Sequence, residues 1–147
     1  MNRRLLIAVL GLATAVLLAS CAPAHRVTYI PEGGSYTVDD LARLLDEADL
    51  GAAVRIDTSD AVDERQSTLA DLRREGDDTG RLADTLTLDF PADLAAVPVL
   101  VEHATYEGAE AWVVIEAWGE EGGSLTHRQL WVLSYDDGAV LAALRKD

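Results

Sequence analysis

The chain has 147 residues, of which 12 are basic and 26 acidic, and its formal net charge is −14. This balance argues against a nucleic-acid-binding protein, which needs clustered lysine and arginine side chains to neutralise phosphates. The single cysteine, Cys21, excludes an intramolecular disulfide. The length suits one domain with its own core.

The first twenty residues are typical of a secretion signal. Arg3 and Arg4 precede an uncharged apolar run over residues 5–18. This run is too short to span the bilayer core of ~30 Å, which takes ~20 apolar residues, and its length suits the apolar part of a signal peptide. The alternative interpretation is an uncleaved N-terminal membrane anchor with an incidental cysteine.

The end of the signal carries a recognisable motif, Leu18-Ala19-Ser20-Cys21. It resembles the lipobox of bacterial membrane lipoproteins. The resemblance implies cleavage between Ser20 and Cys21, followed by attachment of lipid, such as palmitate, to Cys21. The mature protein is then expected on the extracytoplasmic face of the cell membrane, because two or more acyl chains give stable anchoring. Eleven arginines against one lysine, Lys146, are similar to the usage of actinobacterial proteins.

Removal of residues 1–20 would take away two arginines and leave 10 basic and 26 acidic side chains, a net charge of −16. Such a charge opposes adhesion to anionic lipids, so the acyl chains alone would hold the protein at the membrane. Residues 21–36 contain two prolines and a Gly-Gly pair and are predicted to form a tether. Within this segment, the side chains of residues 27–30 alternate in polarity enough to predict a short edge strand. Residues 37–147 are predicted to form one domain.

Helices are expected in the first half of that domain. Thr37 and Asp40 resemble a capping box at the start of a helix that ends before Gly51. A short extended connector follows over residues 52–56. The second helix begins at Ser59 or Asp60 and ends near residue 74. Residues 82–90 have helical spacing of leucine and phenylalanine, but they also alternate as a strand does.

The last fifty residues favour strands. Runs of β-branched and aromatic residues occupy 97–106, 110–119, 126–135 and 139–144, and glycine-containing turns separate them. The predicted fold class is therefore α+β, with two to three N-terminal helices packed on a C-terminal four-stranded antiparallel meander.

Alternation along the second predicted strand divides its residues between two faces. Val113 and Ile115 are expected in the main core, facing the helices. Trp112 and Trp118 then point to the opposite face, and Trp131 lies on the next strand. Two or three short helices are expected to cover one face only, which would leave Trp118 accessible. Since exposed aromatic residues often mark contact sites, Trp112 and Trp118 are the predicted binding surface for an envelope protein or glycan.

No pattern indicates catalysis. The motif G-x-S-x-G is absent, and Gly123-Ser124-Leu125 lacks the second glycine. His103 and His127 could face each other across the sheet, but two ordinary strand histidines are the simpler interpretation. The acidic residues at 57–64 suit helix capping, and residues 76–80 suit a solvated turn better than a calcium loop. We expect no catalytic residue, no metal and no cofactor.

Residues 130–141, Leu-Trp-Val-Leu-Ser-Tyr-Asp-Asp-Gly-Ala-Val-Leu, resemble the closing hairpin of PepSY-type domains, which are secreted α+β modules. The resemblance implies an inhibitory or protein-binding role without catalysis. Cystatin-like and NTF2-like folds are equally compatible with the pattern. The expected function is a lipid-anchored, non-catalytic binding or accessory module of the cell envelope. The alternative is a small-ligand-binding lipoprotein that uses a cleft between helices and sheet.

Overall fold

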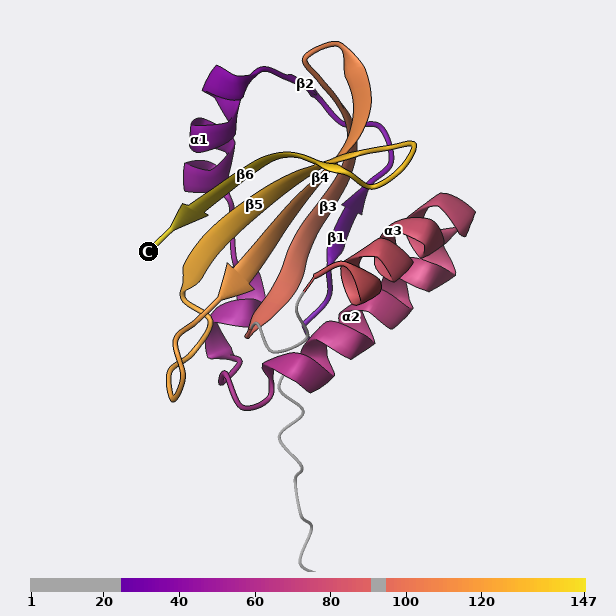
Figure 1. The fold of residues 1–147 in the computed structure, drawn as a ribbon. Helices are drawn as coiled ribbons and strands as arrows, with labels where there is room; N and C mark the ends of the chain where they lie inside the picture. The colour runs from indigo at the N-terminus through magenta and orange to yellow at the C-terminus, as the bar shows by residue number, and fades with distance from the viewer. Residues whose placement is uncertain (1–24, 91–94) are drawn as a thin grey trace, which may run out of the picture.

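A computed structural model describes residues 25–90 and 95–147 (Figure 1). The described residues form an α+β fold in which three α-helices and one 3₁₀ helix accompany a six-stranded sheet. The elements in chain order are β1 (Thr28–Ile30), β2 (Ser35–Tyr36), α1 (Val38–Glu47), η1 (Gly51–Arg55), α2 (Ala61–Glu75), α3 (Asp77–Leu88), β3 (Ala96–Tyr106), β4 (Ala109–Trp118), β5 (His127–Ser134) and β6 (Val140–Lys146).

The predicted meander is present, but it is only part of the sheet. Strands β3, β4, β5 and β6 are antiparallel neighbours in that order. Strands β1 and β2 both pair with β3 in the parallel sense, so the prediction of four purely antiparallel strands is wrong. Alternation predicted the four long strands and a short edge strand at 27–30, which is β1, whereas the two residues of β2 are too few to show a period.

The prediction of a tether over 21–36 is wrong for Thr28–Ile30 and Ser35–Tyr36, which pair with β3 in the sheet, while 21–24 lie outside the described residues. The buried Glu102 carboxylate accepts hydrogen bonds from the Gly34 amide at 2.5 Å and the Tyr36 hydroxyl at 2.9 Å. A side chain at Gly33 would collide with Glu102, so glycine allows this close approach. Burial and the bond to Glu102 raise the pKa of Tyr36 to about 12.

Helix α1 covers one face of the sheet. The Asp40 carboxylate accepts hydrogen bonds from the Thr37 amide at 2.9 Å and the Thr37 hydroxyl at 2.8 Å, which hold the pKa of Asp40 below its usual range. Leucines of α1 pack with Val113 and Ile115, which confirms the predicted core face of β4. The predicted extended connector at 52–56 is instead largely the 3₁₀ helix η1.

Helices α2 and α3 cover the other face, as Figure 1 shows. Residues 82–90 are mostly helical, but α3 begins at Asp77, earlier than predicted, because Gly76 separates it from α2 in an extended conformation. Residues 77–80, considered for a solvated turn or a calcium loop, therefore form the first turn of α3. Among the described residues, no helix is long and apolar enough to cross a membrane.

Candidate ligand-binding cleft

The predicted site residues do not form an open surface. Ser20 and Cys21, the predicted cleavage and lipidation positions, lie outside the described residues. Trp112 is 3% exposed and Trp118 is 8% exposed, so the expectation that Trp118 is accessible is wrong. Trp112 is buried because α2 and α3 pack on the face of the sheet opposite α1, and Trp118 is covered by Arg145 and His127.

The two strand histidines are not brought together. His103 pairs in register with Trp112, and His127 pairs with Trp118. Six residues of β4 therefore separate them, or about 20 Å at ~3.3 Å per residue. The His103 ring stacks on Tyr135 with 4.6 Å between centroids, and the His127 ring lies 4.7 Å from that of Trp118. Within residues 25–90 and 95–147, no three His, Cys, Asp or Glu side chains are grouped as a metal site would require.

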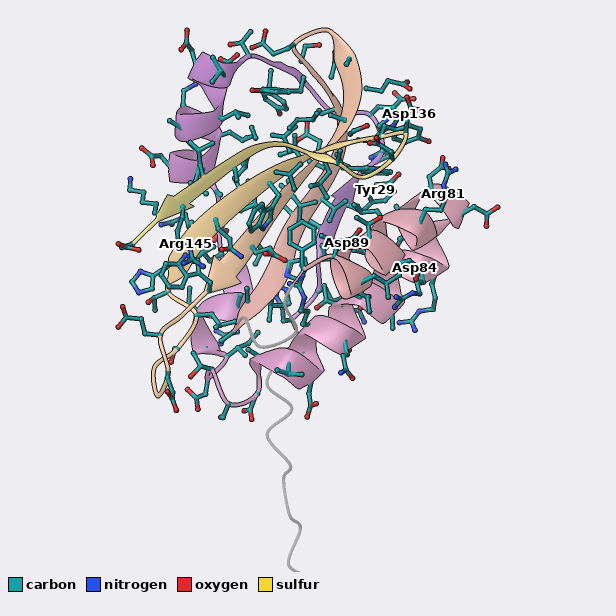
Figure 2. All side chains as sticks on the ribbon, viewed as in Figure 1. Tyr29, Arg81, Asp84, Asp89, Asp136 and Arg145 are labelled. Atoms are coloured by element: carbon teal, nitrogen blue, oxygen red, sulfur yellow. The ribbon has the colours of Figure 1, made fainter. Side chains whose placement is uncertain are left out.

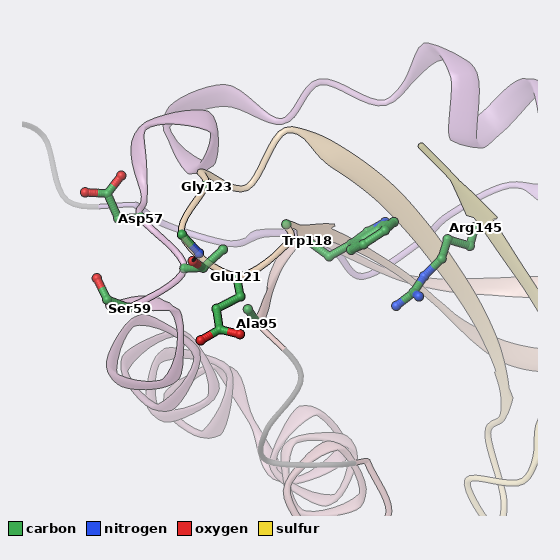
Figure 3. Close-up of a pocket in the computed structure, with 10 residues that line it drawn as sticks. Asp57, Ser59, Ala95, Trp118, Glu121, Gly123 and Arg145 are labelled. Atoms are coloured by element: carbon green, nitrogen blue, oxygen red, sulfur yellow. Dashed lines mark hydrogen bonds between the residues drawn. The ribbon is translucent and has the colours of Figure 1, made fainter.

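A cleft opens at the end of the sheet where β4 finishes, and its volume is about 780 Å³. Four parts of the chain line it: the loop of residues 57–59 before α2, Ala95 before β3, the end of β4 with the turn that follows it (Trp118, Gly119 and residues 121–123), and Arg145 on β6 (Figure 3). Small-molecule sites span roughly 300–1,000 Å³, so the cleft has the size of a ligand site.

Backbone hydrogen bonds fix the loop side of the cleft. The Thr58 amide donates to the Gly123 carbonyl at 2.9 Å, and the Thr58 hydroxyl accepts from the Gly122 amide at 3.1 Å. The Ser124 hydroxyl donates to the Asp57 carboxylate at 3.2 Å. Gly119 approaches the backbone of Ser124 so closely that a Cβ would not fit. The two loops therefore hold each other in place.

Trp118 and Arg145 form the opposite side. The Arg145 guanidinium lies over the Trp118 ring, 3.9 Å from its centroid, in the geometry of a cation–π interaction. The Trp118 indole donates to the Arg128 carbonyl at 3.1 Å, which fixes the ring. Figure 2 shows Arg145 at the end of the sheet that is remote from Asp136.

A chain of buried polar groups leads from α2 to Arg145. The Gln129 amide oxygen accepts from Arg145 Nη2 at 3.1 Å, and Gln129 Nε2 donates to Glu116 at 2.6 Å. The Trp131 indole donates to the same carboxylate at 2.9 Å. Arg65 forms an ion pair with Glu116, and both side chains are buried. Each member of this polar chain holds the next in a defined orientation.

Sequence reasoning missed this polar chain. The available signal was Glu116, an acid within the apolar run of β4 on the same face as the tryptophans. An acid at a buried strand position requires a partner. The partner, Arg65, lies on a helix 51 residues away in the sequence, and no local pattern connects the two.

The cleft contains charges of both signs that do not neutralise one another directly. Among the described residues, no carboxylate oxygen lies within 4.0 Å of the Arg145 guanidinium, and no basic nitrogen lies that close to Glu121. Figure 3 shows Arg145 and Glu121 on opposite sides of Trp118. The arrangement offers hydrogen-bonding and ionic contacts to a ligand, together with one aromatic ring.

Comparison of the chain with protein-family models, with curated proteins and with solved structures found no match.

Proposed function

We propose that this protein is a lipid-anchored binding protein of the extracytoplasmic membrane face, without catalytic activity, and that its cleft holds a small ligand. The cleft carries the proposal, because it has a ligand's volume and combines fixed loops, an aromatic ring and a charged side chain held by a buried polar chain. The lipobox-like motif ending at Cys21 supports the location.

The burial of the tryptophans favours a small ligand over a protein or glycan docked on an aromatic face. Trp112 packs among apolar side chains of α2 and α3 and is closed to a large partner. Trp118 lines the cleft with the little surface that remains accessible. A molecule that enters the cleft can contact Trp118, whereas a flat stacking platform does not exist there.

The binding proposal is tested with a variant that fills the cleft. Ser59 is an exposed cleft residue, and Ser59→Trp would place an indole in the cleft without altering the core. Ser67→Trp makes the same change at an exposed position of α2 that does not line the cleft, and serves as the control. Native mass spectrometry of the full-length protein, purified in mild detergent, measures small molecules that remain bound.

We expect a bound small molecule in the wild-type protein and in Ser67→Trp, and its loss in Ser59→Trp. Equal retention in all three proteins would place binding outside the cleft. Absence of any bound molecule, together with no response to a library of small envelope metabolites in a thermal-shift assay, would contradict the proposed function.

The anchoring proposal is tested separately with Cys21→Ala. The sequence has no other thiol to receive the lipid. We therefore expect the variant to accumulate as uncleaved precursor or to leave the membrane as a soluble protein, measured by fractionation and intact mass. Membrane association at the mass of the wild-type protein would show that Cys21 is not the anchor.

A further inference from the structure

We propose that the ligand of the cleft is a small zwitterion, whose anionic group binds Arg145 and whose ammonium group binds Glu121. The inference rests on the proposed function and names the chemistry of the ligand. A free amino acid, a short peptide and the headgroup of a zwitterionic lipid share this chemistry, and the experiment below distinguishes the first two from the third.

Arg145 supplies the anion-binding half. Five other arginines pair with carboxylates, as expected in a chain with this excess of acids: Arg43, Arg65, Arg73, Arg74 and Arg81. Arg145 instead donates to the neutral amide of Gln129 and lies on an indole. A carboxylate at position 129 would orient the guanidinium and also cancel its charge. The amide orients it and leaves the charge for a ligand.

The geometry of Arg145 suits a carboxylate or phosphate. Its Nε and Nη2 both donate to the Gln129 oxygen, at 3.3 and 3.1 Å, so one edge of the guanidinium is held and its plane is fixed. A fixed planar fork recognises a carboxylate or phosphate better than a mobile one, because less conformational freedom is lost on binding. Gln129 is thus a positioning residue, itself fixed by Glu116.

Glu121 supplies the cation-binding half. It is an exposed residue of the turn between β4 and β5, and the hydrogen bonds between this turn and Thr58 hold the turn in place. Arg145 and Glu121 line one cleft without forming an ion pair. A zwitterion that spans the cleft places opposite charges beside both walls, whereas a simple anion would also face the Glu121 carboxylate.

The middle of the cleft matches the uncharged part of such a molecule. Trp118 and Ala95 line the cleft with apolar atoms between the charged walls. A volume of about 780 Å³ accommodates a short peptide as well as an amino acid.

The experiment uses the full-length protein in mild detergent and isothermal titration calorimetry with four probes. Tri-alanine carries both charges, N-acetyl-tri-alanine carries only the anion, and tri-alanine amide carries only the cation. O-phosphoethanolamine represents a zwitterionic lipid headgroup. We expect binding of tri-alanine or O-phosphoethanolamine, at least tenfold tighter than either singly charged peptide. Stronger binding of tri-alanine identifies a peptide or amino acid, and stronger binding of O-phosphoethanolamine identifies a lipid headgroup.

Matched variants test the anion-binding role of Arg145 and the cation-binding role of Glu121 separately. Arg145→Met should weaken binding of the zwitterion ~10- to 100-fold, as expected for loss of a charge-assisted hydrogen-bond pair. Arg81→Met, which changes an exposed arginine of α3 far from Arg145 (Figure 2), should have no effect. Glu121→Gln should weaken the zwitterion about tenfold and leave N-acetyl-tri-alanine unaffected or stronger, whereas Glu120→Gln, next to the cleft lining, should leave both unchanged. Thermal unfolding verifies that each variant is folded.

Three results would overturn the proposal: equal affinity for tri-alanine and its acetylated form, wild-type affinity in Arg145→Met, or no binding of either zwitterion. The proposed function is tested independently, by comparing the small molecules that remain bound to Ser59→Trp and to Ser67→Trp. A co-purifying molecule that is lost in Ser59→Trp but is insensitive to Arg145→Met would support the proposed function and refute the zwitterion.

Discussion

The buried ion pair between Arg65 and Glu116 gives the sharpest test of the fold. Glu116 is fully buried and accepts hydrogen bonds from three side chains, namely Arg65, Gln129 and Trp131. Glu116→Ala would leave the guanidinium of Arg65, a residue that is 7% exposed, with only the carbonyls of Ala96 and Leu86 as partners. Removal of one member of a buried pair costs ~3–5 kcal/mol.

We therefore expect Glu116→Ala to lower the free energy of unfolding by about 4 kcal/mol, a large fraction of the ~5–15 kcal/mol of a typical domain. Denaturation in urea, followed by far-UV circular dichroism, measures this change by linear extrapolation. The exposed Glu120→Ala is the control, with an expected effect below ~0.5 kcal/mol. The double variant Arg65→Met with Glu116→Leu should recover at least ~2 kcal/mol, because it no longer buries an uncompensated charge.

A loss below about 1 kcal/mol in Glu116→Ala would refute this reasoning, since it would mean that water reaches the guanidinium once the carboxylate is removed. A double variant no more stable than Glu116→Ala would show that Gln129 and Trp131, which lose their acceptor in both proteins, account for the cost.

Three further predictions concern stability. Ile115→Ala should cost ~2–5 kcal/mol by cavity formation in the core beneath α1, and a loss under ~1 kcal/mol in urea denaturation would contradict that placement. Gly80→Ala should stabilise α3 by ~0.5–1 kcal/mol, because the added Cβ meets no atom within 4 Å, and a lower thermal midpoint would contradict this. The raised pKa of Tyr36, about 12 against 10.0, means that its contribution to stability is complete below pH 10 and is lost as the pH rises to 12. Tyr36→Phe should therefore lose less stability than the wild-type protein over that interval in a urea series, and parallel curves would count against the bond to Glu102.

Much of the fold was predictable because its signals are local. The period of two in residues 97–144 defined the four long strands and the inward side of β4. The pair of Thr37 and Asp40 defined the start of α1. Both signals depend on residues within one element, where side-chain periodicity follows directly from backbone geometry.

The features of the fold and the cleft that were not predicted depend on contacts between segments distant in the sequence. The parallel pairing of β1 and β2 with β3 was not predictable, because alternation over residues 27–30 indicates a strand without naming its partner, and the two residues of β2 show no period. The burial of Trp118 depends on where Arg145 and His127 lie relative to it, which no local pattern specifies. The cleft joins residues 57–59, Ala95, the end of β4 with its following turn, and Arg145, and the proximity of these four segments is a property of the tertiary structure.

The pairing of β1 with β3 also determines the order in which this chain can fold. His25 bonds to the carbonyl of Pro98, and 73 residues of sequence separate them. Strand β3 is the common partner of β1, β2, β4 and α2, so a chain that has emerged only as far as α3 lacks the surface on which its first third packs. Closing so long a loop is slow, and the contacts that stabilise the closed loop can form only when β3 is in place. A nascent chain released from its N-terminus onward therefore cannot pack its first third into the sheet until β3 has been synthesised.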